Sequence, residues 1–246
     1  MPTSLPSQKH IYLSPPPALL MSRFPLRPFL TRLAHRSLST TPTLTMRVPY
    51  APKEAPTEEA RPVYERIAAR RHPRPLIPLD LTLLHNPAVA DGWNSFIGAI
   101  RTKTSVPDAL KELAIARIAA LNGAVHEWDV HAALAVKAGV SNDVMEVVFS
   151  LPFVGRGEEK MESEELGKLS GEERAVLEYT DQMTVGVRVD DGVGEKLREV
   201  LGDTQTVELT ATVAAYNCVS RFLVALDVGE CNGRAMKKVE ELGQGH

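Results

Sequence analysis

Apolar residues recur at helical spacing along most of the chain from residue 57 onward, with polar residues filling the positions between them. This periodicity predicts helices over residues 57–70, 88–103, 107–122, 124–138, 142–149, 170–185, 190–201 and 204–227. No stretch alternates between apolar and polar residues for long enough to predict a β-strand. The chain is therefore predicted to be all-α.

Residues that begin and end helices stand where the periodicity requires them. Asp108 and Ser141 precede apolar runs and suit helix starts, while Gly123 and Gly139 follow such runs and suit C-terminal caps. The sequence Ser170 to Glu173 matches a capping box, in which the side chain of each end residue binds the backbone of the other. These signals support the predicted boundaries.

Two of the predicted helices, over residues 110–121 and 207–226, are apolar on nearly every side, which is typical of buried helices. A polar group that is buried without a partner is costly. We therefore expect each polar residue in these helices to be paired, to line a cavity, or to lie at a helix end or subunit rim. The residues concerned are Glu112, Arg117, Glu208, Asn217 and Arg221.

Charge and composition exclude several classes of protein. The formal net charge is -3 and aromatic residues make up 5% of the chain, so the phosphate-neutralising charge and stacking platforms of a nucleic-acid surface are absent. No apolar run predicts a membrane span. The two cysteines, Cys218 and Cys231, are too few for a disulfide framework and are expected to be reduced. We expect a soluble protein without a nucleic-acid or membrane partner.

The chain is predicted to have one folded domain, residues 47–228, between an N-terminal segment, 1–46, and a C-terminal tail, 229–246. Residues 21–45 combine arginines with apolar residues and a Ser/Thr-rich end and contain no acidic residue, as in a mitochondrial transit peptide. The alternative is a disordered tail, with translation starting at Met46 and a cytoplasmic location. Residues 155–169 are charged and predict an exposed connector, and the tail predicts a short helix or a frayed end.

A candidate set of proton-transfer residues lies on the central pair of helices. Glu127 and His131 are four residues apart and share one helical face, and a hairpin at residues 122–123 would place Glu112 of the preceding helix opposite them. In a dry pocket, burial would raise a glutamate pKa, and a neighbouring carboxylate would keep the histidine protonated. The alternative is an exposed Glu/His pair on a solvated face, and the spacing alone leaves both open.

A zinc site is not predicted from these residues. A zinc helix places two histidines four residues apart, with a glutamate after the first. Here His126 and His131 are five residues apart, so their side chains diverge around the helix. We expect no metal.

The motifs together resemble those of the carboxymuconolactone decarboxylase and alkylhydroperoxidase-D superfamily. The resemblance is carried by Glu112, the run ARIAALNG, the motif EWxxH and the run AALAVKAG, and it is extended by the segments LLHNPAVADGW, LSGEERAVLEYTDQMT and VELTATVAAYNCVSRFLVAL. It covers roughly residues 55–228. It implies an alkylhydroperoxidase-D-like helical bundle that forms homo-oligomers, commonly trimers or hexamers.

The peroxidase branch of the superfamily uses a glutamate, a CxxC pair and a histidine. This chain is similar at Glu112 and His131, but the two cysteine positions fall on Ala124 and Glu127. Without a thiolate there is no nucleophile for a peroxide. An antioxidant activity of the alkylhydroperoxidase kind is therefore kept only as an alternative, and Cys218, expected to be buried, is no substitute.

The decarboxylase branch shares the Glu/His spacing and uses no cofactor. The resemblance implies that carbon dioxide is removed from a small lactone or cyclic carboxylic acid such as 4-carboxymuconolactone. Within it, we expect His131 to donate or shuttle the proton and Glu112 and Glu127 to orient and tune it. The candidate substrate-binding residues are Arg117, Arg221 and Trp128, the last of which is typical of an EWxxH subgroup rather than of decarboxylases. A non-catalytic oligomeric binding protein is the remaining alternative.

Overall fold

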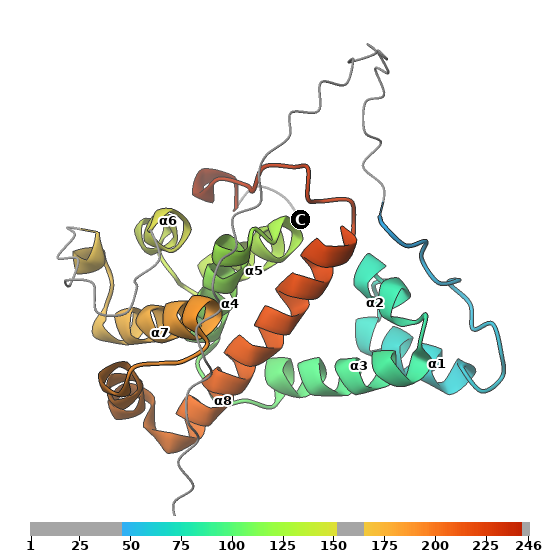
Figure 1. Cartoon of the computed structure of the whole chain (residues 1–246), viewed down its shortest axis with the longest axis horizontal. Coiled ribbons are helices and arrows are strands. Elements are labelled where there is room, and N and C mark those ends of the chain that lie inside the picture. The colour runs from blue at the N-terminus through green and yellow to red at the C-terminus, as the bar shows by residue number, and fades with distance from the viewer. Residues whose placement is uncertain (1–45, 152–164, 243–246) are drawn as a thin grey trace, which may run out of the picture. The chain divides into compact units, whose positions relative to one another are not determined.

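The computed structural model describes residues 46–151 and 165–242, which belong to one compact unit within residues 42–246. The described residues form helices and loops, with no strand among them (Figure 1). The all-α prediction is therefore confirmed. The predicted targeting segment up to residue 45 and most of the predicted connector lie outside the described residues.

The helices follow one another much as the periodicity predicts. They are α1 Arg61–Arg71, α2 Pro78–Leu83, α3 Pro87–Thr102, α4 Asp108–Asn122, α5 Val125–Lys137, α6 Asn142–Ser150, α7 Gly171–Asp181 and α8 Asp191–Leu226. Short helical turns lie at Leu166–Lys168, Gln182–Gly186 and Val239–Glu241. The start of α1 is a few residues later than predicted, and α2 was not predicted.

Helix α2 escapes the periodicity because six residues are too few to display a helical repeat. Its first turn is held by Asp80, whose carboxylate accepts a hydrogen bond of 3.0 Å from the backbone N–H of Ile77. Arg71 of α1 donates two bonds of 2.8 Å to the same carboxylate. An ion pair between α1 and α2 therefore stabilises a helix that the local sequence does not predict.

The predicted caps are present. Ser170 and Glu173 form the reciprocal capping box of α7, and the Ser141 hydroxyl accepts a hydrogen bond of 3.2 Å from the backbone of Val144. Gly123 ends α4 in the left-handed conformation, with φ 65°, and thereby turns the chain into α5. Gly202 interrupts α8 with φ 71° and ψ 172°, at the break predicted between two helices.

Helix α4 lies at the centre of the described residues and packs against α5, α6, α7 and α8 (Figure 1). Every residue from Leu110 to Ala119 is buried, including the charged ones. Leu113, Ala114 and Ile118 are completely covered. The prediction that this helix is buried on all sides is confirmed.

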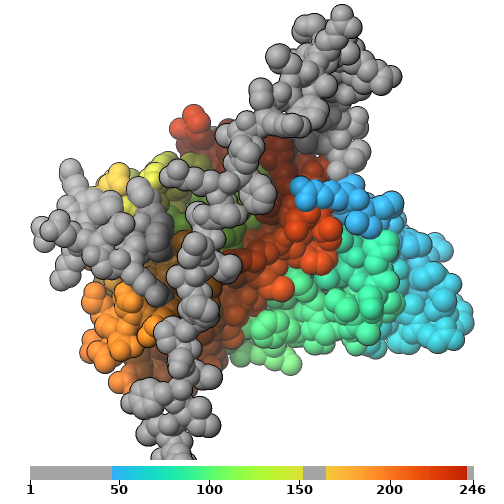
Figure 2. Space-filling view, in the orientation of Figure 1, coloured from blue at the N-terminus to red at the C-terminus, as the bar shows by residue number. Residues whose placement is uncertain are grey.

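Helix α8 crosses α3 and reaches the surface beside it (Figure 2). Contrary to the expectation from sequence, its length and hydropathy are those of a helix that could cross a membrane, although 44% of its most apolar stretch is buried inside the chain. Buried core helices of globular domains meet the same criterion. Here α8 contributes Leu209, Val213 and Leu223 to the same core as α4.

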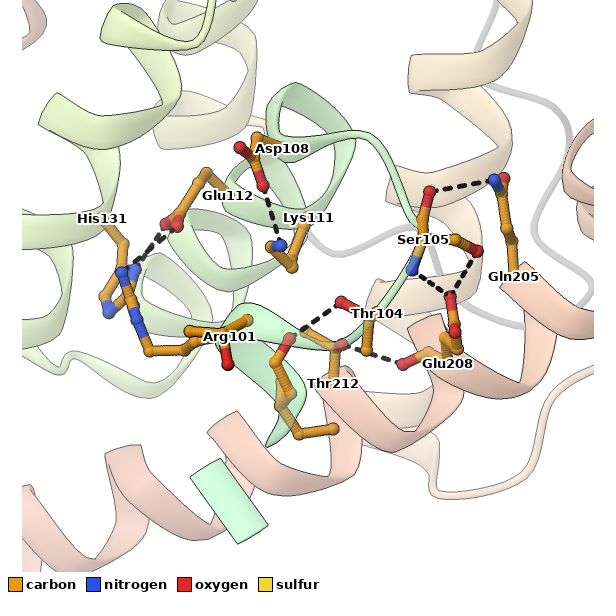
Figure 3. Close-up of polar contacts among 12 residues, drawn as sticks. Arg101, Thr104, Ser105, Asp108, Lys111, Glu112, His131, Gln205, Glu208 and Thr212 are labelled. Carbon is orange, nitrogen blue, oxygen red and sulfur yellow. Dashed lines mark hydrogen bonds and ion pairs between the residues drawn. The ribbon is translucent and has the colours of Figure 1, made fainter. Parts of the chain in front are cut away.

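The polar residues of α8 have the partners that burial of an apolar helix demands. Glu208 accepts bonds of 2.7 and 2.9 Å from the backbone and hydroxyl of Ser105, which ties α8 to the start of α4 (Figure 3). Asn217 accepts a bond of 3.2 Å from Asn122 and donates one of 2.9 Å to Thr184. The expectation that these residues are paired is confirmed.

The described part of the C-terminal tail packs against α5. The Lys237 carbonyl accepts a hydrogen bond of 2.8 Å from the Trp128 indole, and the Lys237 N–H donates one of 3.3 Å to Asp129. Val239 and Leu242 are buried in the main core. The described part of the tail forms one short helical turn, Val239–Glu241. Its contacts anchor it to the core, so this part of the tail is not frayed.

Candidate functional site

The hairpin of α4 and α5 brings Glu112 and His131 into contact. Glu112 Oε2 lies 2.5 Å from His131 Nδ1, and both residues are buried, with exposed fractions of 6% and 7% (Figure 3). Gly123 makes this contact possible, because its left-handed conformation reverses the chain between the two helices. The alternative from sequence, in which Glu127 and His131 form an exposed pair on a solvated face, is wrong, because both are buried.

Burial lowers the pKa of His131 below its ordinary value of 6.5, and the hydrogen bond and charge of Glu112 oppose this only in part. The expectation that the carboxylate keeps His131 protonated is therefore wrong, because desolvation of the imidazolium outweighs the attraction. A neutral ring that donates its Nδ1 proton to the Glu112 carboxylate carries its lone pair on Nε2. His131 is thus suited to accept a proton.

Glu127 lies on the same face of α5 as His131, one turn earlier, and is 2% exposed. Neither of its carboxyl oxygens has a hydrogen-bond partner among the described residues. Burial raises the pKa of Glu127 well above its ordinary value of 4.5, although its place in the first turn of a helix would favour the anion. The side chain is therefore suited to be a neutral carboxylic acid that can donate a proton.

Arg101 and Tyr216 complete the cluster, and neither was predicted. Arg101 Nη2 lies 3.7 Å from Glu112 Oε1, and Arg101 Nη1 donates a hydrogen bond of 2.9 Å to the Tyr216 hydroxyl. The Tyr216 ring meets His131 edge to face, with ring centroids 4.9 Å apart. In the sequence, Arg101 resembles an ordinary basic residue at a helix C-terminus and Tyr216 an apolar core residue, so no local signal marks them.

The protonation of Tyr216 follows from its surroundings. Burial raises the pKa of Tyr216 to about 12, although Arg101 lowers it, and the charges of Glu112 and Glu127 act in the same direction as burial. At neutral pH the phenol therefore keeps its proton.

Arg117 is not brought to this cluster. Its guanidinium is 1% exposed and makes two bonds, of 2.6 and 2.7 Å, to the fully buried carboxylate of Asp181 on α7. It also donates bonds of 2.9 Å to the backbone carbonyls of Val148 and Leu151 at the end of α6. This arrangement joins three helices and leaves no exposed surface for a substrate carboxylate.

The other two candidate substrate-binding residues also lie apart from the cluster. Arg221 is exposed on α8 and bonds to Asn217 and to the backbone carbonyl of Thr184. Trp128 is completely buried and packs against Phe149, with ring centroids 4.9 Å apart. Its position next to Glu127 in sequence therefore serves packing.

Cysteine and metal chemistry find little support in the described part of the chain. Ala124, at the first cysteine position of the peroxidase pattern, is the buried N-cap residue of α5. Cys218 is exposed, contrary to expectation, because it lies on the side of α8 away from the core, and Cys231 is buried. Within residues 46–151 and 165–242, no group of three histidines, cysteines or acidic residues is placed to hold a metal ion.

An apolar groove lies between α3 and α8 on the surface of the described unit. Its volume is about 260 Å³. Two of the residues that line it are largely exposed, Phe96 at 50% and Val89 at 52%. The lining residues are Val89, Gly92, Trp93, Phe96, Ile97, Ala215 and Cys218.

Comparison with solved structures shows what the fold is similar to. The apo structure of the debrominase Bmp8 has a TM-score of 0.54 at 16% identity, covering 75% of this chain and 92% of that one. A cysteine-to-alanine variant of Bmp8 in complex with 2,3,4-tribromopyrrole gives 0.52 at 17% identity, covering 75% and 88%. A protein of unknown function from Agrobacterium tumefaciens, proposed to be an antioxidant defence protein AhpD, gives 0.48 at 19% identity, covering 58% and 90%.

Comparison at the level of sequence gives one family match. No curated protein matches the chain significantly. Residues 87–160 match the carboxymuconolactone decarboxylase family, and this stretch contains α3 to α6 with the glutamates and the histidine of the cluster. Over this stretch the chain is similar to the carboxymuconolactone decarboxylase family, and its fold is similar to that of the debrominase Bmp8.

Proposed function

We propose that the protein is a cofactor-free, decarboxylase-like enzyme that acts on a small lactone or cyclic carboxylic acid by acid/base proton transfer. The observation that carries the proposal is a buried base beside a buried acid on one helix. His131 bonds Glu112 and has a lowered pKa, which favours a neutral base, and Glu127, one turn away, has a raised pKa and no hydrogen-bond partner among the described residues. Acid/base catalysis needs two such groups with opposite protonation at the same pH.

The proposed reaction replaces a carboxylate with a hydrogen atom. The bond between the ring carbon and the carboxylate breaks, carbon dioxide leaves, and the electron pair moves into a conjugated carbonyl group. Glu127 then gives its proton to carbon. Solvent then supplies a proton, which His131 accepts on Nε2 and passes to Glu127. One proton is therefore consumed for each carbon dioxide released. A water-poor site favours loss of the charged carboxylate.

The main competing activity is reduction of peroxides. It requires a thiolate, which reacts with the peroxide and then forms a disulfide. The two positions that would supply the cysteines hold Ala124 and Glu127, and the exposed Cys218 is on another helix. These residues favour acid/base chemistry over redox chemistry at the site.

The proposal predicts turnover of 4-carboxymuconolactone by the full chain, measured as carbon dioxide release and as ultraviolet absorbance change. His131→Ala and Glu112→Gln should each lower kcat at least about tenfold, because the first removes the base and the second the carboxylate that orients it. Arg66→Gln is the matched control, since it removes an exposed charge that pairs with Asp91, and it should leave kcat unchanged. A folded wild type without turnover would reject this substrate, and turnover that survives His131→Ala would reject the proposed mechanism.

We propose further that the chain forms homo-oligomers, with the groove between α3 and α8 at the contact. Exposed large apolar residues in a shared groove are typical of protein interfaces. Phe96→Glu is expected to reduce the molar mass of the particle in light scattering, because it places a charge in the contact. The substitution Val187→Glu, at an exposed residue that does not line the groove, serves as the control and should leave the mass unchanged. A monomeric wild type would contradict the proposal.

A further inference from the structure

Arg101 differs from the other buried or well-paired arginines of the described residues in what it faces. Arg66, Arg71 and Arg117 each make two hydrogen bonds to one aspartate, with distances between 2.6 and 3.0 Å. Arg101 reaches a carboxylate only at 3.7 Å, on Glu112, and that carboxylate already bonds His131. The two-pronged geometry that guanidinium groups prefer toward an anion is therefore unused at Arg101.

Tyr216 adds a second unused donor at the same place. Its hydroxyl oxygen accepts the hydrogen bond of 2.9 Å from Arg101, so its own proton is not spent on that contact. No bond donated by this hydroxyl is found within the described ranges. The phenol keeps its proton at neutral pH because its pKa is about 12. The guanidinium also polarises the phenol, which makes the O–H a stronger donor.

We propose that Arg101 and Tyr216 bind the oxygen atom on which negative charge develops during the reaction. The substrates are then acids in which the electron pair left by the carboxylate is conjugated with a carbonyl group. This inference rests on the proposed function and narrows its substrate class. Donors fixed in advance toward such an oxygen are a large source of rate acceleration.

The position of the two donors suits this role. The Tyr216 ring lies against the edge of His131, and Arg101 lies beside Glu112, so both donors border the acid/base pair. As carbon dioxide leaves, the electron pair of the broken bond moves to the carbonyl oxygen, which becomes an enolate oxygen bound by the two donors. When Glu127 protonates carbon, the pair returns and the carbonyl is restored. No oxidant or reductant is needed.

Binding of 4-nitrophenol to the full chain tests the inference without turnover, because its phenolate resembles an enolate and absorbs at a different wavelength from the phenol. Wild type is expected to bind the phenolate and to increase its fraction at a pH where most free probe is protonated. Tyr216→Phe and Arg101→Gln should each weaken binding at least about tenfold. Arg101→Lys should keep part of the affinity, since it keeps the charge but loses the planar fork. Arg66→Gln, which removes an exposed arginine paired with Asp91, is the control and should bind as wild type does.

Circular dichroism and thermal unfolding of each variant separate a loss of donors from a loss of fold. If wild type does not bind the phenolate, or if folded Tyr216→Phe and Arg101→Gln bind it as tightly as wild type, the inference is overturned. If phenolate binding depends on both residues but 4-carboxymuconolactone is not turned over, the anion site stands and the proposed substrate fails. If His131→Ala abolishes turnover but Tyr216→Phe binds the phenolate as tightly as wild type does, the proposed function stands and this inference fails.

Discussion

Replacing Arg117 with methionine is expected to lower the free energy of unfolding by about 3–5 kcal/mol, because the variant leaves the carboxylate of Asp181 buried without its two strongest bonds. Methionine keeps much of the apolar stem, so the loss reports the charge rather than a cavity. The ends of α6 and α7 should loosen together, because the same guanidinium binds both. Urea unfolding followed by circular dichroism measures the change.

Two matched variants show whether burial is the cause. Arg66 makes the same two-bond contact with Asp91, but its side chain is 53% exposed, so Arg66→Met should lower the free energy of unfolding far less than Arg117→Met does. The double variant Arg117→Met with Asp181→Leu should recover most of the lost stability, since it removes the stranded charge as well. Equal losses of stability from Arg117→Met and Arg66→Met would show that burial does not increase the contribution of the Arg117–Asp181 pair.

Replacing Glu127 with leucine is expected to stabilise the protein by about 1–3 kcal/mol and to lower turnover by roughly 100-fold or more. The gain arises because both carboxyl oxygens are buried and have no hydrogen-bond partner in the described part of the chain. The loss arises because leucine has no proton to give. Opposite changes in stability and activity are typical of a functional group kept in an unfavourable environment. Unfolding and carbon dioxide release would be measured on the same preparation.

The pH dependence of stability gives Glu127 a second test. Its folded pKa is raised above the unfolded value, so the folded chain holds the proton more tightly than the unfolded chain does. Its contribution to stability is therefore fully present below about pH 4.5 and is lost as the pH rises toward and through the folded pKa. Relative to Glu127→Gln, wild type should become less stable between about pH 5 and 8. A constant difference across that range would show that Glu127 is ionised or solvated in the folded protein.

The order of the helices and the contact between Glu112 and His131 could be predicted from local sequence. Helical periodicity and capping residues act over a few positions, and Gly123 announces the turn that makes α4 and α5 a hairpin. Two side chains on adjacent antiparallel helices can then be placed opposite each other from spacing alone. The same reasoning predicted that the polar residues of the apolar helices have partners.

The remaining parts of the site depend on contacts between distant segments. Arg101 and Tyr216 are 115 residues apart, and no periodicity connects them. Arg117 was a plausible anchor for a carboxylate until the structure showed a carboxylate of the chain itself, Asp181, in that place. The protonation of His131 was misjudged because the depth of burial, which sequence does not report, outweighs the neighbouring charge.

The tail that clasps α5 has a consequence for how the protein matures. Lys237 binds the two residues that directly follow Glu127, so a segment made about 100 residues later in translation holds the helix that carries Glu127 and His131. The hairpin of α4 and α5 therefore leaves the ribosome before its clasp does. We expect the nascent hairpin to remain without its clasp until Lys237 has emerged, and Glu127 and His131 to be aligned only then.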